Sequence, residues 1–218
     1  MVFKVKRGPA TTTRDRIMQM LKTDGELTAR EMTERLGITG MGVRRHIDAL
    51  ERSGLIESRT IRQPMGRPAS LYRLTEQADH YFPKNYHGIA LDLLGELAQE
   101  AGEPVVNRLF ERRKQTLYRK YAGKMTGERL ADKVSALADI QNENGYMAQW
   151  EQSGDDEFVL TEYNCPISQI ANAYNHACKC ELDLFESLLG AEVSRTECLA
   201  KGGQKCAYTI RKRAASPN

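Results

Sequence analysis

The stretch TAREMTERLGITGMGVRRHIDALERSG, residues 28–54, decides the fold of the N-terminal third of the chain. Thr28 followed three residues later by Glu31 forms a capping box, which predicts that a helix begins there. Gly37 predicts its end, and a second helix follows with Val43, Ile47 and Leu50 on one apolar face. Two short helices joined by a glycine-containing turn are typical of a helix-turn-helix motif.

The segments around this stretch extend the motif to a domain. Before it, Ile17, Met20 and Leu21 recur at helical spacing and predict a first helix from Thr13. After it, LIESRTI and SLYRLT alternate like strands on either side of a loop at 63–69 that is rich in Gly and Pro. Three helices followed by a β-hairpin predict a winged helix-turn-helix domain over residues 1–80.

The remaining residues predict two further regions. Apolar spacing indicates amphipathic helices over 89–97, 105–121 and 127–140, so we expect a helical linker and dimerisation region at 81–142. From Gly145 the apolar period drops to two, and the order of segments predicts a β-β-α-β-β sensor domain at 143–218. The fold class expected for the whole chain is α+β.

The charge is divided unevenly along the 218 residues. Residues 1–80 carry 15 Lys and Arg against 10 Asp and Glu, whereas residues 81–218 carry 17 against 19. A basic N-terminal module on a nearly neutral body favours a polyanionic partner for that module alone. No stretch approaches 18 consecutive apolar residues, and the N-terminus lacks a signal peptide pattern. We therefore expect a cytoplasmic protein that does not enter a membrane.

The second helix of a helix-turn-helix lies in the major groove, where its first turns meet base edges. Arginine is the usual donor to guanine, and a basic wing reaches the backbone or the minor groove. The alternative is a solvated basic face, but the wing at the right distance favours double-stranded DNA, with a homodimer on a pseudo-palindromic operator. The candidate DNA contacts are Thr39, Met41, Arg44, Arg45, His46, Arg62 and Arg67.

All five cysteines lie between Cys165 and Cys206, with twelve residues separating Cys165 from Cys178 and twenty-seven separating Cys178 from Cys206. No C-x-x-C pair is present, so a zinc knuckle is disfavoured, and widely spaced thiolates suit an iron–sulfur cluster. Ordinary buried cysteines are the alternative. One unbroken helix would hold Cys165 and Cys178 about 18 Å apart, so a shared site requires a break near Asn175. Cys178 and Cys180 would face different sides of a helix, so at most one of them is expected to be a ligand.

The chain resembles the SufR-type repressors of iron–sulfur cluster assembly over nearly its whole length. The residues that carry the resemblance are TAREMTERLG, VRRHIDALERSGLI, MGRPASLYRLT, FPKNY, NENGYMA, FVLTEYNCPI, CELDLFESLLG and VSRTECLAKGGQKCAYTI. The family's Cys-x12-Cys-x27-Cys pattern implies that Cys165, Cys178 and Cys206 hold a 4Fe–4S cluster. A further cysteine of some members corresponds to Glu192, so Cys198, Cys180 or a group other than cysteine is left as the fourth ligand. The resemblance implies a repressor of suf genes whose cluster-loaded dimer binds the operator and whose cluster loss derepresses transcription.

Two other classes of function are a site for a small ligand and an enzyme. The C-terminal region is similar to 4-vinyl-reductase-like domains, which also end in a Gly…Cys-x-Tyr-x-Ile strand, and this implies a site for a small apolar ligand with structural cysteines. An absorbance band near 400 nm in anaerobic protein would distinguish a cluster from such a site. An enzyme has the least support, because the sequence contains no phosphate loop, nucleophile elbow or paired-carboxylate motif.

Overall fold

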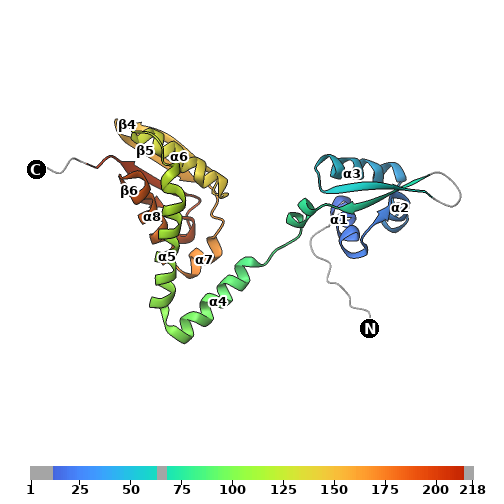
Figure 1. Cartoon of the computed structure of the whole chain (residues 1–218), viewed down its shortest axis with the longest axis horizontal. Helices are drawn as coiled ribbons and strands as arrows, with labels where there is room; N and C mark the ends of the chain where they lie inside the picture. The colour runs from blue at the N-terminus through green and yellow to red at the C-terminus, as the bar shows by residue number, and fades with distance from the viewer. Residues whose placement is uncertain (1–11, 63–67, 214–218) are drawn as a thin grey trace, which may run out of the picture. The chain divides into compact units, whose positions relative to one another are not determined.

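The computed structural model describes residues 12–62 and 68–213. The chain divides between Lys84 and Asn85 into two compact units (Figure 1). The division lies four residues beyond the boundary expected at residue 80. The boundary expected between residues 142 and 143 falls inside the second unit, where the helices and the sheet form one body.

The N-terminal unit is a winged helix-turn-helix, as predicted. Its helices are α1 (Thr13–Asp24), α2 (Ala29–Leu36) and α3 (Gly40–Arg52), followed by a 3-10 helix, η1 (Glu76–Tyr81). Its strands are β1 (Leu27–Thr28), β2 (Ile56–Ile61) and β3 (Ala69–Leu74), which form an antiparallel sheet in the order β1-β3-β2.

Local signals in the sequence account for the helix ends of this unit. Thr28 and Glu31 form the predicted capping box at the start of α2, with each side chain bonded to the other residue's backbone N–H. Gly37 ends α2 in the left-handed conformation, with φ of 66°, which glycine adopts without strain. The apolar faces of the helices meet in a core that includes Ile17, Val43 and Ile47.

The C-terminal unit places helices against one antiparallel sheet. Its elements are α4 (Tyr86–Ala101), α5 (Glu103–Tyr121), η2 (Ala122–Lys124), α6 (Leu130–Glu143), β4 (Ala148–Gly154), β5 (Glu157–Glu162), α7 (Ser168–Ala173), α8 (His176–Leu189), β6 (Glu192–Glu197), η3 (Leu199–Lys201) and β7 (Cys206–Arg211). The strand order is β4-β5-β7-β6, so β7 lies between β5 and β6 and pairs with both. The α+β class is confirmed, with two helices between the hairpins where one was expected.

The helices of this unit differ in how much apolar surface they bury. α6 and α8 pack on the sheet, and α5 packs along α8. Val134 and Leu137 of α6 are buried in the same core as Phe185 and Tyr208. The expectation that the helices over 89–140 form a dimer seam is therefore corrected for α6, because the apolar face of this helix is already covered within the chain.

α4 is the exception, since none of its residues is buried. Tyr86, Ile89 and Leu93 are 73%, 59% and 65% exposed. No helix among the described residues combines the length and the apolar character needed to cross a bilayer.

Candidate DNA-binding surface and cysteine site

The candidate reading helix, α3, exposes most of the residues predicted to contact DNA. The Thr39 hydroxyl caps the helix by accepting a hydrogen bond from the backbone N–H of Gly42 at 3.2 Å. Met41 is 84% exposed, and Arg44 and Arg45 are exposed on the outer face. His46 is half-buried.

The arginines of this unit differ in their ion pairing. Arg59 binds Glu26 at 2.6 Å and Arg73 binds Glu57 at 2.7 Å, so their charges are partly neutralised within the sheet. Within residues 12–62 and 68–213, no acidic side chain pairs with Arg44 or with Arg45. Two unpaired guanidinium groups on the exposed face of the second helix suit contacts with phosphates and base edges. Arg62 is exposed at the end of β2, and Arg67 lies outside the described residues.

The helix break required for a shared cysteine site is present. α7 ends at Ala173 and α8 begins at His176, so one straight helix does not separate Cys165 from Cys178. Cys165 follows β5, and its carbonyl accepts a hydrogen bond from Ser168 N–H at 3.0 Å as the chain turns into α7. The sulfur of Cys165 accepts a hydrogen bond from the backbone N–H of Ile167.

Three of the other four cysteines lie near Cys198. The Cys178 and Cys198 side chains share a hydrogen bond, and the charge of Cys198 also raises the pKa of the Cys165 and Cys206 thiols. The backbone N–H of Leu199 donates to the sulfur of Cys206 at 3.4 Å. The structure thus brings Cys165, Cys178 and Cys206 together and adds Cys198.

The cysteines of this four-cysteine site are partly shielded from water, since Cys198 and Cys206 are buried and Cys165 and Cys178 are half-buried. Burial raises the pKa of Cys165 to about 11 and the pKa of Cys178 and of Cys206 to about 12. Burial disfavours the charged thiolate, so these groups are neutral at pH 7 unless a cation compensates them.

A buried polar network holds the wall of the site. Arg195 donates to the carbonyl of Cys178 at 2.6 Å and lies 3.6 Å from the carboxylate of Glu181. The Tyr208 hydroxyl donates to Glu181 at 3.1 Å and lies 3.3 Å from Glu162. Burial and the charge of Glu181 raise the pKa of Glu162 to about 8. No local pattern in the sequence indicates this network, because its members are far apart along the chain.

Cys180 lies elsewhere, so the option that it is the fourth ligand is not supported by its position. Its sulfur donates to Glu111 Oε1 at 3.3 Å, and His176 Nε2 lies 2.9 Å from the same oxygen. Lys114 binds the other oxygen of Glu111 at 2.7 Å. Two side chains of α5, Glu111 and Lys114, therefore contact residues of α8.

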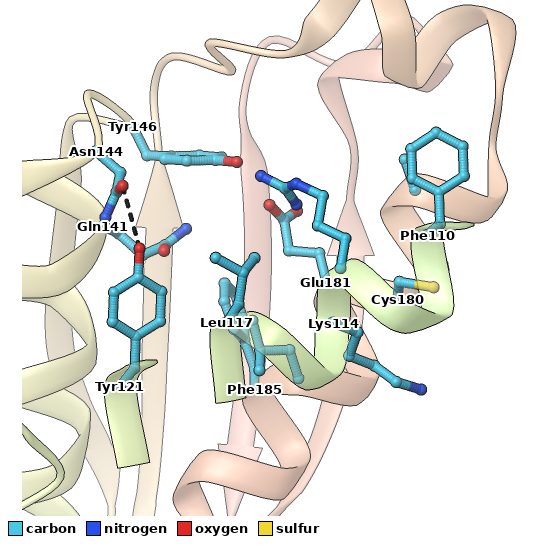
Figure 2. A pocket seen from close by; sticks show the side chains of 13 residues that line it. Phe110, Lys114, Leu117, Tyr121, Gln141, Asn144, Tyr146, Cys180, Glu181 and Phe185 are labelled. Carbon is cyan, nitrogen blue, oxygen red and sulfur yellow. Dashed lines mark hydrogen bonds between the residues drawn. The ribbon is translucent and has the colours of Figure 1, made fainter. Parts of the chain in front are cut away.

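A cavity between α5, α6 and α8 is the candidate place for a small ligand (Figure 2). Phe110 and Leu117 line it together with Glu181 and Lys114, and the Tyr121 hydroxyl donates to Asn144 at 3.2 Å on its wall. Its volume is about 60 Å³. Ligand pockets measure roughly 300–1,000 Å³, so a drug-sized apolar molecule does not fit this conformation.

Comparisons with known proteins agree with the N-terminal architecture. Residues 10–59 match a family of helix-turn-helix domains. No curated protein matches the chain.

Solved structures share only distant likeness with the chain. PadR of Bacillus subtilis in complex with operator DNA is 16% identical, with 83% of this chain and 99% of PadR covered and a TM-score of 0.30. The regulator YodB of B. subtilis is 21% identical, with 42% and 81% covered and a TM-score of 0.28. The H-NOX domain of Shewanella oneidensis is 12% identical, with 64% and 87% covered and a TM-score of 0.41. The helix-turn-helix match and the wing observed here identify the N-terminal unit of this chain as a winged helix-turn-helix domain.

Proposed function

We propose that the protein is a homodimeric repressor of iron–sulfur cluster assembly (suf) genes that senses a bound 4Fe–4S cluster through its C-terminal unit. The observation that carries the proposal is the gathering of Cys165, Cys178, Cys198 and Cys206 from four separate segments into one partly buried site. The sequence resemblance assigns three of these as ligands. The position of Cys198 makes it the candidate for the fourth.

The donor set fits an iron–sulfur cluster. Four cysteine thiolates are the usual ligands of a 4Fe–4S cluster, and hydrogen bonds from backbone N–H groups to the sulfurs tune its potential. Both Cys165 and Cys206 accept such bonds.

The proposed signal depends on which segments the four cysteines join. Cys165 follows β5, Cys178 belongs to α8, and Cys198 and Cys206 stand on either side of η3. When bound, the cluster supplies iron–thiolate bonds that are lost on oxidation. Without those bonds the connection between α8 and the last hairpin rests on contacts such as the hydrogen bond from Arg195 to the Cys178 carbonyl. If the loaded form binds the operator more tightly, loss of the cluster weakens binding by the same coupling free energy.

α4 is the proposed dimer contact. Its exposed apolar side chains, Tyr86, Ile89 and Leu93, are the kind of surface that a second copy covers. Two copies would present two α3 helices to a pseudo-palindromic operator with half-sites about one helical turn, or a multiple of it, apart.

Anaerobic purification with iron and sulfide analysis tests the proposal. We expect four iron and four sulfide per chain, an absorbance band near 400 nm, and tighter binding of the loaded protein than of the apoprotein to DNA upstream of the suf genes. Serine at Cys165, Cys178, Cys198 or Cys206 should remove the band and the difference in DNA binding together, because a hard oxygen is a poor cluster ligand. Cys180→Ser is the matched control and should keep both. A cluster retained in the Cys198→Ser variant would leave the fourth position to another group, and a colourless protein with unchanged DNA binding would refute the sensor.

A further inference from the structure

We propose that Glu111, His176 and Cys180 form a second metal site, suited to Zn²⁺ and separate from the four-cysteine site. The inference does not depend on the proposed iron–sulfur function. It rests on three different donor types that α5 and α8 bring to one point.

The three donors converge on a single carboxylate oxygen. His176 Nε2 lies 2.9 Å from Glu111 Oε1, and Cys180 Sγ lies 3.3 Å from it. The donor atoms of all three residues lie within 4.8 Å of one another. Imidazole nitrogen, thiolate sulfur and carboxylate oxygen are the ligands that zinc takes in proteins.

These spacings are close to those of a zinc coordination sphere. Ligands at 2.0–2.3 Å from a tetrahedral ion are about 3.3–3.8 Å apart. The observed separations from Glu111 Oε1 need changes of only a few tenths of an ångström to reach that range. Because the side chains of His176 and Glu111 are 24% and 38% exposed, water can reach the fourth position.

Neighbouring charges support the carboxylate ligand. Lys114 binds Glu111 Oε2 at 2.7 Å and Asp183 at 3.1 Å, so it holds the far oxygen and leaves Oε1 directed toward α8. Carboxylates that bind metals are commonly held in this way by an outer hydrogen bond. Zn²⁺ would take the place of the Cys180 thiol proton, which is released to solvent, and would bind His176 in its neutral form.

Helix geometry keeps the two sites apart. His176 and Cys180 stand four residues apart on α8 and are separated by about 40° around its axis, so they share one face. Cys178, between them, points about 160° away from either. Accordingly, Cys180 lies in a small core with Val106 and Phe110 of α5, whereas Cys178 packs against the core that contains Cys198 and Cys206.

A variant of the full chain isolates the site. Replacement of Cys165, Cys178, Cys198 and Cys206 by serine leaves Cys180 as the sole cysteine, so a thiolate-to-cobalt absorbance band on Co²⁺ addition reports Cys180 alone. We expect one Co²⁺ per chain, displaced by Zn²⁺. Adding Cys180→Ser should abolish the band, and adding His176→Gln or Glu111→Gln should weaken Co²⁺ binding at least tenfold. His87→Gln, an exposed histidine on α4, is the matched control and should change nothing.

A second measurement covers the possibility that the four-serine variant does not fold. The chain with its other cysteines unaltered should bind one more Zn²⁺ in equilibrium dialysis than its His176→Gln variant does, whether or not the four-cysteine site is occupied. The proposal would be overturned if the His176→Gln and Glu111→Gln variants bound as much Zn²⁺ as the parent chain. It would also be overturned if the parent chain bound no Zn²⁺ through Glu111, His176 and Cys180.

Discussion

The substitution Gly203→Ala tests how the loop after β6 positions Cys198. A Cβ atom at residue 203 would stand 2.8 Å from the Cys198 carbonyl oxygen and 2.9 Å from Glu197 Cγ. Both distances are shorter than van der Waals contact, and the oxygen belongs to backbone, so the loop must shift. The same movement stretches the hydrogen bond from Gly203 N–H to the Cys198 carbonyl, now 3.0 Å long.

The expected magnitude follows from these two effects. Overpacking of this kind costs about 1–3 kcal/mol and a weakened hydrogen bond about 0.5–1.5 kcal/mol, so we expect the free energy of unfolding to fall by about 1.5–4.5 kcal/mol. The adjacent Gly202→Ala is the control, because no atom lies within 4 Å of its added Cβ. Its positive φ of 84° still makes alanine strained there, at about 1–2 kcal/mol.

Urea unfolding of the apoprotein measures both changes as shifts in the midpoint at constant slope. The proposed cluster would provide a second measurement, since a displaced Cys198 should lower iron content in Gly203→Ala more than in Gly202→Ala. Equal stability of Gly203→Ala and the parent chain would show that the loop does not hold Cys198 by this close approach.

Three further perturbations address the other parts of the molecule. Arg44→Ala should weaken operator binding about tenfold or more in a salt-controlled titration, because one bidentate base contact provides about 1–3 kcal/mol; unchanged affinity and base preference would count against α3 as the reading helix. Leu93→Asp on α4 should shift the dimer toward monomer in light scattering, whereas Gln99→Asp, an exposed polar position on the same helix, should not; a dimer unaffected by Leu93→Asp would place the contact elsewhere. The hydrogen bond from Lys114 lowers the pKa of Glu111 from 4.5 to about 2. Because the folded state favours the ionised carboxylate, this ion pair stabilises the fold fully above pH 4.5, and the stabilisation is lost as the pH falls toward 2. Glu111→Gln should therefore destabilise the chain at pH 6 more than at pH 3 in urea unfolding, and an equal effect at both would contradict the ion pair.

The N-terminal unit could be predicted almost entirely, because its signals are local. The Thr28–Glu31 capping box, Gly37 and the apolar spacing of α3 each act within one or two turns of helix. The pairing of Arg59 with Glu26 could not be read in the same way, since β1 and β2 come together only through β3.

The C-terminal unit was predictable in its elements and less so in its assembly. The period-two segments identify the strands, but the order β4-β5-β7-β6 depends on long-range pairing that brings Glu162 opposite Cys206. The break between α7 and α8 was predicted from the condition that Cys165 and Cys178 could share a site, and from the weak helical stretch that contains Asn172, Asn175 and His176. The position of Cys198 depends on the loop around η3, whose conformation no local pattern specifies.

The odd number of cysteines is explained by the periodicity of α8. An alternation of His176, Cys178 and Cys180 cannot direct three ligands to one point on a helix, because adjacent members of the series face opposite sides. This rule separates Cys178 from Cys180 in the sequence, and it left Cys180 only as an option for the fourth cluster ligand. The spacing of four residues between His176 and Cys180 was the available signal, but Glu111 lies 65 residues before His176 and enters only when α5 packs along α8. Four thiols therefore belong to the side of α8 that faces the last hairpin, and the fifth belongs to the side that faces α5. A displacement of α8 would move residues of both proposed sites, because Cys178 and Cys180 belong to this same helix.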